Sequence, residues 1–463
     1  MRKFARTISG VTPLAVMTKP MSCPGRCLYC PTYPDAPQSY TPESPAVLRA
    51  MKCDYDARQQ VELRERIFSG MGHPTDKIEM IIMGGTFLAH PVDYQYQFIK
   101  DCYDGLNGTI SATLEEAKKV NETATHRCTG LCIETRPDWC RQEEIDRMLE
   151  FGATRVELGV QTLSDDVYRL VRREHQVEDV VKATALLREH GFKVYYHWMP
   201  GLPGSTPDMD LELSGMLFND DRFKPDGLKL YPTMVVAGTE LEQWYREGRY
   251  QPYDNDTMVN LLIGIKSIVP KYVRISRVLR DIPSKFIVAG LKDSLRDIIK
   301  VRMKDGDIEC KCIRCREYGH RAKSNCRIGE PHLVRMDYDA SDGREVFLSF
   351  EDEGETLFGL LRMRIQVKPV PVSGLESNGN LALIRELHVF GPEVPLSEQM
   401  TEAAQHKGLG RALLREAERI AGDEFHSQHL MVLSGTGARE YYRAEFGYRL
   451  LGDYMVKNLN LRV

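Results

Sequence analysis

Short apolar runs alternate with helical stretches along the first 280 residues, and this alternation is the feature that most constrains the fold. Helix-like stretches such as EEIDRMLEFG and VEDVVKATALLREHG each end in a glycine, as helix C-termini often do. Strands that alternate with helices pair in parallel through right-handed crossovers. We therefore predict an α/β fold, a partial or complete β/α barrel with its functional groups at the carboxyl ends of the strands. The expected strands are 12–18, 78–83, 131–135, 155–160, 193–199 and 227–232.

The pattern changes after residue 295. Residues 300–333 are charged, rich in cysteine and poor in periodicity, so we expect a linker module there. The strand-like runs EVFLSFE, TLFGLLRMRI and LALIRELHVF follow, then a helix, then HLMVLS and MVKNL. These runs predict a mixed α+β domain. The expected division is a barrel over 1–295, a Cys-rich linker over 296–335 and the α+β domain over 336–463.

Bulk composition excludes several classes of protein. The chain has 463 residues, ordinary apolar content and a formal net charge of −4. The overall charge therefore gives no indication of nucleic-acid binding. We find no apolar run long enough to span a membrane. The basic N-terminus has only a short, broken apolar part and does not resemble a secretory signal. Twelve cysteines without such a signal favour a reducing compartment, and we expect a cytoplasmic protein.

Three cysteines crowd into the stretch KPMSCPGRCLYCPTYP directly after the first expected strand. Cys23, Cys27 and Cys30 have the spacing Cys-x3-Cys-x2-Cys. A closed zinc site wants a fourth ligand, whereas an iron–sulfur cluster held by three thiolates keeps one iron open. The spacing resembles the signature of radical S-adenosylmethionine (SAM) enzymes, whose open iron binds the SAM amine and carboxylate. A zinc knuckle and buried thiols are the alternatives.

A glycine-rich turn follows the second expected strand. Met83, Gly84 and Gly85 belong to the sequence MGGTF, which resembles the turn of radical SAM enzymes that meets the methionine part of SAM. Glycine permits that approach because it has no Cβ. The resemblance implies a [4Fe-4S] cluster and SAM as cofactors, and carbon-radical chemistry at the barrel mouth.

A second cofactor pattern occurs in the C-terminal domain, in QHKGLGRALLREAERIA. Gly408 and Gly410 open a helix with an apolar face, and glycines at a helix N-terminus expose N–H groups to a pyrophosphate. The pattern resembles the acyl-CoA loop of GNAT acetyltransferases. The strand IRELHVF before it and the Tyr441–Tyr442 pair after it also fit. The alternative is a glycine that begins an ordinary amphipathic helix.

A radical SAM barrel joined to a GNAT domain resembles the catalytic subunit of the Elongator complex and its single-chain archaeal and bacterial relatives. The blocks DKIEMIIMGGTF, IETRPDWC, RVELGVQ, MPGLPG, IRELHVFG and YYRAEFGYRLLGDYMVK carry the resemblance over nearly the whole chain. It implies a tRNA carboxymethyluridine synthase that uses acetyl-CoA. A SAM-derived 5′-deoxyadenosyl radical would activate the acetyl methyl, which would add to carbon 5 of the wobble uridine. Hydrolysis of the thioester would leave a carboxymethyl group.

The resemblance also implies roles for individual residues. Lys77 would help to hold acetyl-CoA, although a lysine before a strand is usually solvated. Tyr442, with Tyr441 beside it, would sit near the thioester. The CoA cleft would be lined by Glu386, Leu387, His388 and Val389, and the pyrophosphate would be cradled by Gly408, Leu409, Gly410 and Arg411.

Eukaryotic relatives carry an N-terminal extension before the barrel, and this chain has almost none. We therefore expect any tRNA contacts that the extension makes to come from other residues here. Arg274, Arg277 and Arg280 are candidates for phosphate contacts, which position a nucleic acid without reading its sequence. A flipped uridine would stack on an aromatic side chain. Tyr231 and Trp198 are the candidates, with a role in the barrel core as the alternative. A homodimer or accessory subunits like those of Elongator are further possible partners.

The linker cysteines are expected to form a structural zinc site. Cys310, Cys312, Cys315 and Cys326 can supply four thiolates. His320 and His332 compete with Cys326 for the fourth position, and unligated thiols are the alternative.

Two other functions compete with tRNA modification. A protein lysine acetyltransferase could keep the cluster domain as a scaffold, with Glu386 as its general base. A non-catalytic tRNA-binding scaffold is the third reading.

Overall fold

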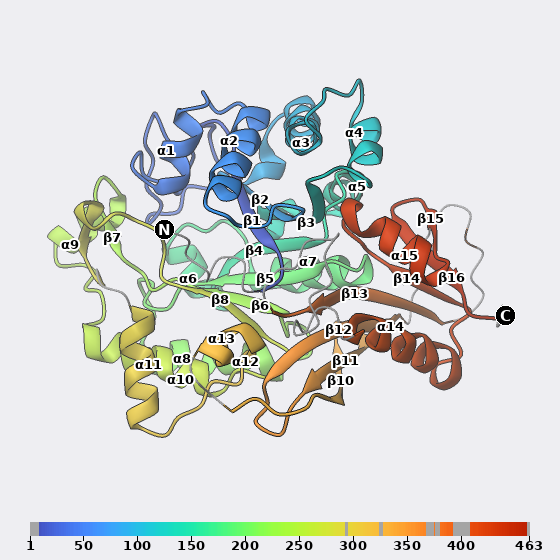
Figure 1. Cartoon of the computed structure of the whole chain (residues 1–463). Helices are drawn as coiled ribbons and strands as arrows, with labels where there is room; N and C mark the ends of the chain where they lie inside the picture. Colours follow the sequence, from blue (N-terminus) through green and yellow to red (C-terminus); the bar gives the residue numbers. More distant parts are fainter. Residues whose placement is uncertain are drawn as a thin grey trace.

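Two seven-stranded sheets, a two-stranded sheet and their helices make up the described part of the chain (Figure 1). The computed structural model describes residues 9–291, 295–323, 327–366, 375, 380–391 and 408–460. Cys326 therefore lies outside the described residues. In the part of the chain that is described, no helix is both long enough and apolar enough to cross a membrane.

The first sheet is fully parallel and has the order β1-β2-β3-β4-β5-β6-β8. The six expected strands are confirmed, and the seventh, β8, was not foreseen. Because β1 and β8 are the two edges, the sheet is a partial barrel. Its strands are β1 (Thr12–Met17), β2 (Lys77–Met83), β3 (Arg127–Thr135), β4 (Arg155–Gln161), β5 (Lys193–Trp198), β6 (Gly227–Leu230) and β8 (Arg274–Val278).

Helices cover the outside of this sheet (Figure 1). The expected helices around residues 143–152 and 177–191 are confirmed, and each is followed by a glycine with positive φ, Gly152 and Gly191. The α-helices are α1 (Pro45–Met51), α2 (Ala57–Gly70), α3 (Val92–Asn107), α4 (Leu114–Asn121), α5 (Gln142–Glu150), α6 (Asp165–Leu170), α7 (Val177–Glu189), α8 (Pro207–Asn219), α9 (Glu240–Arg246) and α10 (Asn255–Ser267). Short elements complete the unit: η2 (Phe87–Ala89), η3 (Pro137–Trp139), η4 (Ser284–Phe286), and the two-stranded pair β7 (Val235–Val236) and β9 (Ile287–Ala289).

The segment expected to be an irregular linker contains helices. They are α11 (Leu295–Asp305), α12 (Ile313–Arg316) and α13 (Tyr318–Lys323). Regular structure also crosses both expected boundaries, because α11 begins at Leu295 and the next strand, β10, begins at His332. The high charge of α11 hid its helical period: only Leu295, Ile299 and Met303 are buried, one residue per turn.

The second sheet has the order β10-β11-β12-β13-β14-β16-β15, and all its pairings are antiparallel except that of β13 with β14. This is the α+β domain expected from the sequence, with the additional strands β10 and β15. Its strands are β10 (His332–Ala340), β11 (Gly343–Glu351), β12 (Leu357–Gln366), β13 (Leu381–Val389), β14 (His429–Val432), β15 (Arg449–Leu451) and β16 (Tyr454–Asn458). Its helical segments are α14 (Leu409–Arg419), η6 (Ile420–Glu424), η7 (Thr436–Ala438) and α15 (Arg439–Phe446).

A β-bulge in β13 opens the centre of the second sheet. Arg362 of β12 pairs with Glu386 and the next residue, Met363, pairs with Ile384, so Arg385 is the extra residue. The pairing of β13 with β14 also stops at Ile384. Because β14 ends at Val432, residues 385–389 of β13 continue beyond this pairing, and we call this part of the second sheet the wedge.

Buried ion pairs join the two sheets. Asp226, just before β6, receives two hydrogen bonds from the guanidinium of Arg385, at 2.7 and 2.8 Å. Glu345 of β11 accepts from the same guanidinium at 2.8 Å and from Arg188 of α7 at 3.1 Å. Arg362 and Arg364 of β12 complete the group, and all of these side chains are almost fully buried. Neighbouring arginines hold the pKa values of Asp226 and Glu345 below their usual range.

Asp226→Asn tests how far the assembly depends on this group. The substitution removes one negative charge and leaves Arg385 and Arg362 buried without it, which we expect to destabilise the fold by about 3–5 kcal/mol. The thermal unfolding midpoint should fall clearly. The control is Asp166→Asn in α6, whose partner Arg169 is exposed; it should leave the midpoint nearly unchanged. Equal shifts in the two variants would contradict the assignment.

Candidate functional site

A cavity of about 730 Å³ occupies the lumen of the partial barrel and is lined by inner-face side chains of all seven strands. At the carboxyl ends of the strands it meets Cys23, Cys27 and Cys30. At the opposite end it meets Glu386 and His388 of β13. The second sheet therefore forms the floor of the cavity, and the cysteine loop lies at its mouth.

The cysteine loop fits a group larger than one metal ion. Sulfurs around a single tetrahedral zinc would lie about 3.8 Å apart. Those of Cys23, Cys27 and Cys30 do not all come within 4.8 Å of one another, although each lines the same cavity. The spread suits three thiolates on different irons of a cluster.

Buried cations lie beneath this loop. The guanidinium of Arg173 donates to the Cys27 sulfur at 3.4 Å. Arg136 is buried as well, its Nη1 has no hydrogen-bond partner, and a Cβ on Gly25 would collide with that atom. Burial and the neighbouring Cys27 raise the pKa of Cys30 to about 11, while Arg280 opposes the shift. Arg136, Arg173 and Arg280 nevertheless place positive charge at the loop. This charge favours an anionic, thiolate-bound group there.

The glycine turn lies beside the loop as the sequence predicts. Met83 ends β2 and lines the cavity together with Gly85. Gly84 and Gly85 have φ values of 132° and 86°, and a Cβ on Gly84 would collide with the Thr18 hydroxyl. Both positions therefore need glycine for the backbone to turn here. Contact with SAM remains a prediction.

Sequence reasoning missed a polar cluster inside the barrel. Glu157 accepts from His197 at 3.0 Å and pairs with Lys229, whose ammonium also donates to Glu134 at 2.8 Å. These residues come from β4, β5, β6 and β3, one from each neighbouring strand. Charged residues at alternate positions of otherwise apolar strands were the available signal, since alternate side chains face the lumen. They offer a polar cofactor or substrate both donors and acceptors.

The two aromatic candidates point in opposite directions. Tyr231 lines the cavity and lies edge-on to His197, with ring centroids 5.3 Å apart. Trp198 packs in the core, and its indole N–H donates to Ser214 of α8 at 3.0 Å. Only Tyr231 is therefore placed to stack on a base in the lumen.

The three candidate arginines do not form one surface. Arg274, at the start of β8, is partly exposed and ion-paired with Glu317, and this carboxylate raises the pKa of Arg274. Arg277 is half exposed and pairs with Asp281 at 2.6 Å, and Arg280 donates to the Ser39 carbonyl and hydroxyl. All three line the cavity. Arg277 and Arg280 lie toward its mouth, whereas Arg274 lies at its floor.

The expected CoA residues meet at the open wedge of the second sheet. A Cβ on Gly410 would come within 3.3 Å of the Tyr441 hydroxyl and 3.5 Å of Val389. The start of α14, the end of β13 and α15 therefore converge on one point. Leu409 is buried against Phe358, and Gly408 precedes α14 with φ 74°. Arg411 pairs with Glu445 at 2.6 Å on the surface.

The two tyrosines of α15 differ in exposure. Tyr442 is buried in the core of the second sheet, and burial raises its pKa. Tyr441 is more exposed, and its pKa is raised to about 12 by burial. Both hydroxyls therefore stay protonated at neutral pH and can donate hydrogen bonds.

The residues of β13 divide between two faces. Leu387 packs against the core of the second sheet, and Val389 packs with Leu409. Glu386 and His388 face the barrel cavity instead. Glu386 accepts from Arg362 at 2.7 Å and from Lys193 at 3.3 Å, and these cations hold the pKa of its carboxyl below the usual range.

Lys77 begins β2 next to Arg127, with which it pairs. A Cβ on Gly437 would collide with Arg127, so this end of β2 lies beside η7 and the start of α15. Lys77 is therefore on the side of the barrel that faces the second sheet. A contact with acetyl-CoA remains a prediction.

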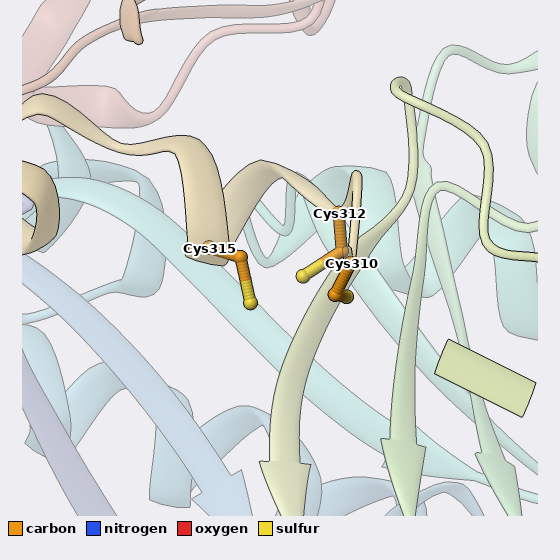
Figure 2. A group of neighbouring side chains, drawn as sticks. All are labelled: Cys310, Cys312 and Cys315. Atoms are coloured by element: carbon orange, nitrogen blue, oxygen red, sulfur yellow. The ribbon is translucent and has the colours of Figure 1, made fainter. Parts of the chain in front are cut away.

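The linker cysteines do converge. Cys310, Cys312 and Cys315 bring their sulfurs within 4.8 Å of one another, and Figure 2 shows them gathered beside α12. Lys266 lies 3.8 Å from the Cys315 sulfur and favours thiolates there. This spacing fits one tetrahedral ion held by three of the four expected ligands. Of the proposed alternatives for the fourth, His320 neighbours Glu317 and His332 begins β10.

A parallel partial barrel with three cysteines at its mouth defines a radical SAM enzyme, and the second sheet adds a GNAT-like part. Residues 20–214 match the Radical SAM superfamily, and residues 225–305 match the Radical_SAM C-terminal domain.

Relatives extend the comparison over the whole chain. The tRNA uridine(34) acetyltransferase of Dehalococcoides mccartyi is 63% identical over 99% of this chain and 100% of its own length. Human Elongator complex protein 3 is 42% identical over 99% of this chain and 86% of its own length. The structure of archaeal Elp3 from Methanocaldococcus infernus with an N-terminal deletion is 44% identical, covers 98% of this chain and 100% of that one, and superposes with a TM-score of 0.86. The chain belongs to the family of tRNA uridine(34) acetyltransferases and Elongator complex protein 3.

Two single substitutions separate the two cysteine groups. After anaerobic reconstitution, we expect the unaltered protein to hold about four iron atoms and Cys27→Ala to lose them. Cys312→Ala should keep the iron and lose zinc, because its sulfur belongs to the other group. Cys102→Ala, a buried thiol in the core, is the matched control and should keep both metals. Elemental analysis and the spin signal of the reduced cluster are the measurements; iron retained by Cys27→Ala would contradict the assignment.

Proposed function

We propose that this protein is a tRNA carboxymethyluridine synthase that acts on carbon 5 of the wobble uridine. The family relatives named tRNA uridine(34) acetyltransferase support the substrate. The observation that carries the proposal is the shared cavity, which reaches from the cysteine loop to β13 of the GNAT-like sheet. A group delivered at β13 would enter the same space as a radical generated at the mouth.

Cys23, Cys27 and Cys30 would hold a [4Fe-4S] cluster, and Met83, Gly84 and Gly85 would contact SAM. When bound, these cofactors supply a 5′-deoxyadenosyl radical that can take a hydrogen atom from the acetyl methyl. The barrel residues then have to position the base and exclude water. Tyr231 would stack on the uracil, and Arg277 and Arg280 at the mouth would contact tRNA phosphates. Arg274 is better suited to fixing the floor, because it is only partly exposed and is ion-paired with Glu317.

Acetyl-CoA would bind at the wedge of the second sheet. The N-terminus of α14, with Gly408, Leu409, Gly410 and Arg411, would take the pyrophosphate. The end of β13 beyond its pairing with β14 would hydrogen-bond the pantetheine arm through its backbone, as a strand accepts another chain. Tyr442 and Tyr441 would lie beside the thioester, and Lys77 would approach from the barrel.

The remaining assignments are structural. We propose a zinc ion at Cys310, Cys312 and Cys315, with Cys326 as the fourth ligand, which would fasten α12 to the barrel. The functional units we propose are 1–295, 296–335 and 336–463.

Lysine acetylation is less well supported. Its expected general base, Glu386, is held as an ion pair with Arg362 and Lys193 inside the barrel cavity. A lysine of another protein would have to enter that cavity to reach it.

Transfer of label provides the direct test. We expect anaerobic protein with SAM, reductant and acetyl-labelled acetyl-CoA to place label in tRNA, at uridine 34, and to place none in a basic peptide. Cys27→Ala should abolish the transfer because it removes the radical source. Label in the peptide without SAM, and none in tRNA, would overturn the proposal.

Gly410→Val tests the wedge. The added side chain would fill the space between Val389 and the Tyr441 hydroxyl, so acetyl-CoA affinity should fall at least about tenfold while the iron content stays unchanged. The matched control is Gly306→Val, directly after α11, which Figure 1 shows apart from β13 and α14; this variant should bind acetyl-CoA normally. Calorimetric titration with acetyl-CoA measures both, and undiminished binding by Gly410→Val would place the cofactor elsewhere.

A further inference from the structure

We propose that His388 is the general base that activates water for hydrolysis of the thioester. This inference rests on the proposed function and adds a residue to it. It assigns to a side chain facing the barrel cavity the step that releases the product from CoA.

His388 is placed where the acyl group would emerge. It lies three residues after Arg385, which bulges out of register, in the part of β13 beyond its pairing with β14. Its neighbour Val389 lies against the Gly410 position of the proposed CoA site. The His388 side chain itself lines the cavity. A thioester held along this edge of β13 would therefore present its carbonyl next to the imidazole.

The ring is oriented by two contacts. It stacks on Phe390 with the ring centroids 4.4 Å apart. Its Nε2 lies 2.6 Å from the carbonyl oxygen of Ser9, which can only accept, so Nε2 carries the proton. The other nitrogen, Nδ1, is then a lone-pair acceptor. Ser9 is in turn held by a β-bridge to Gly391, directly after Phe390. A base oriented by a third group is the arrangement that activates nucleophiles in hydrolytic enzymes.

The charges around the imidazole come from several elements. Glu386 lies on its own strand, Lys193 on β5, Arg274 on β8 and Glu79 on β2. Glu317 lies close by and shares Ser9 with Arg274. Burial lowers the pKa of His388, Lys193 and Arg274 act in the same direction, and Glu386 opposes them. The ring therefore stays neutral at physiological pH, as a base must.

Glu386 is a poorer base at the same floor. Its two carboxylate oxygens are engaged by Lys193 and Arg362, and a strongly ion-paired carboxylate has little affinity for a proton. Its position instead fixes the floor of the cavity around His388.

The step is balanced without an added oxidant or reductant. Nδ1 of His388 removes a proton from water as the oxygen attacks the thioester carbonyl. The carbon–sulfur bond then breaks, and CoA leaves as a thiolate that takes the proton from the imidazolium. The carboxylic acid that remains loses the second water proton to solvent and becomes a carboxylate.

The experiment uses full-length protein reconstituted anaerobically, with His388→Gln as the test variant. Glutamine can still donate to the Ser9 carbonyl but cannot act as a base. We expect tRNA-stimulated release of CoA thiol from acetyl-CoA to fall about 100-fold. The dissociation constant for acetyl-CoA and the iron content should stay within about twofold. The matched control is His429→Gln, a half-buried histidine at the start of β14 outside the cavity, which should keep full activity.

The pH profile separates a base from a structural residue. The unaltered protein should lose hydrolysis as the pH falls through one inflection below about 6.5, because protonation removes the base. This inflection should be absent from the residual rate of His388→Gln. A normal rate in that variant, or a loss explained by acetyl-CoA binding alone, would overturn the proposal. If the unaltered protein shows no hydrolysis with tRNA, the proposed function falls first and this inference falls with it.

Discussion

The arrangement of the two halves depends on one buried group of charges. Asp226 of the barrel unit lies between Arg385 and Arg362 of the second sheet, and Glu345 of that sheet lies against Arg188 of the barrel unit. Each half therefore contributes both signs of charge, and the pairs Arg385–Asp226 and Arg188–Glu345 cross from one half to the other. The two-pronged contact of Arg385 with Asp226 also fixes an orientation, because a guanidinium and a carboxylate meet in one plane. An apolar interface, which is not directional, would hold the two sheets in a less defined orientation. Because the contact of Arg385 with Asp226 fixes that orientation, it also fixes the position of the cavity floor.

Buried ion pairs of this kind contribute little net stability compared with a well-packed apolar interface. Their value here is in where they place β13. The bulge at Arg385 sends that side chain to Asp226 and leaves Glu386 on the same side of the sheet, facing Lys193. After the same bulge, β13 continues beyond its pairing with β14. The bulge at Arg385 thus contributes to three features. It places Arg385 in the ion pairs that join the two halves, it places Glu386 at the floor of the barrel cavity, and it precedes the part of β13 proposed to bind acetyl-CoA.

Much of the fold could be predicted from the sequence, because its strands are apolar, short and separated by helices with clear ends. Six of the seven barrel strands were found, and β8 was missed because Arg274, Ser276 and Arg277 break up its apolar pattern. Those polar residues face the lumen, so the residues that obscured the strand in the sequence are the ones that line the cavity. The cysteine loop and glycine turn were recognisable because their chemistry depends on residues close in sequence. The Glu134–Glu157–His197–Lys229 cluster was not, since its members come from four strands and meet only in the folded barrel. The role expected for Glu386 had the same weakness: a carboxylate on the right strand can serve as a base only if its neighbours leave it free, and two cations from distant segments hold it.

The position of β13 also explains why a radical barrel and an acyltransferase sheet occur in one chain. Alternate side chains of a strand point to opposite faces, so Leu387 and Val389 complete the core around α14 while Glu386 and His388 reach into the barrel. An acyl group bound along the edge between these faces would be held by one sheet and presented to the cavity of the other. Under the proposed function it would need no transfer between separate sites, because β13 already forms part of the cavity wall. If the barrel and the GNAT-like sheet were separate proteins, they would have to reassemble the cavity wall at every turnover. The acyl carbon would then be exposed to water each time the two proteins dissociated.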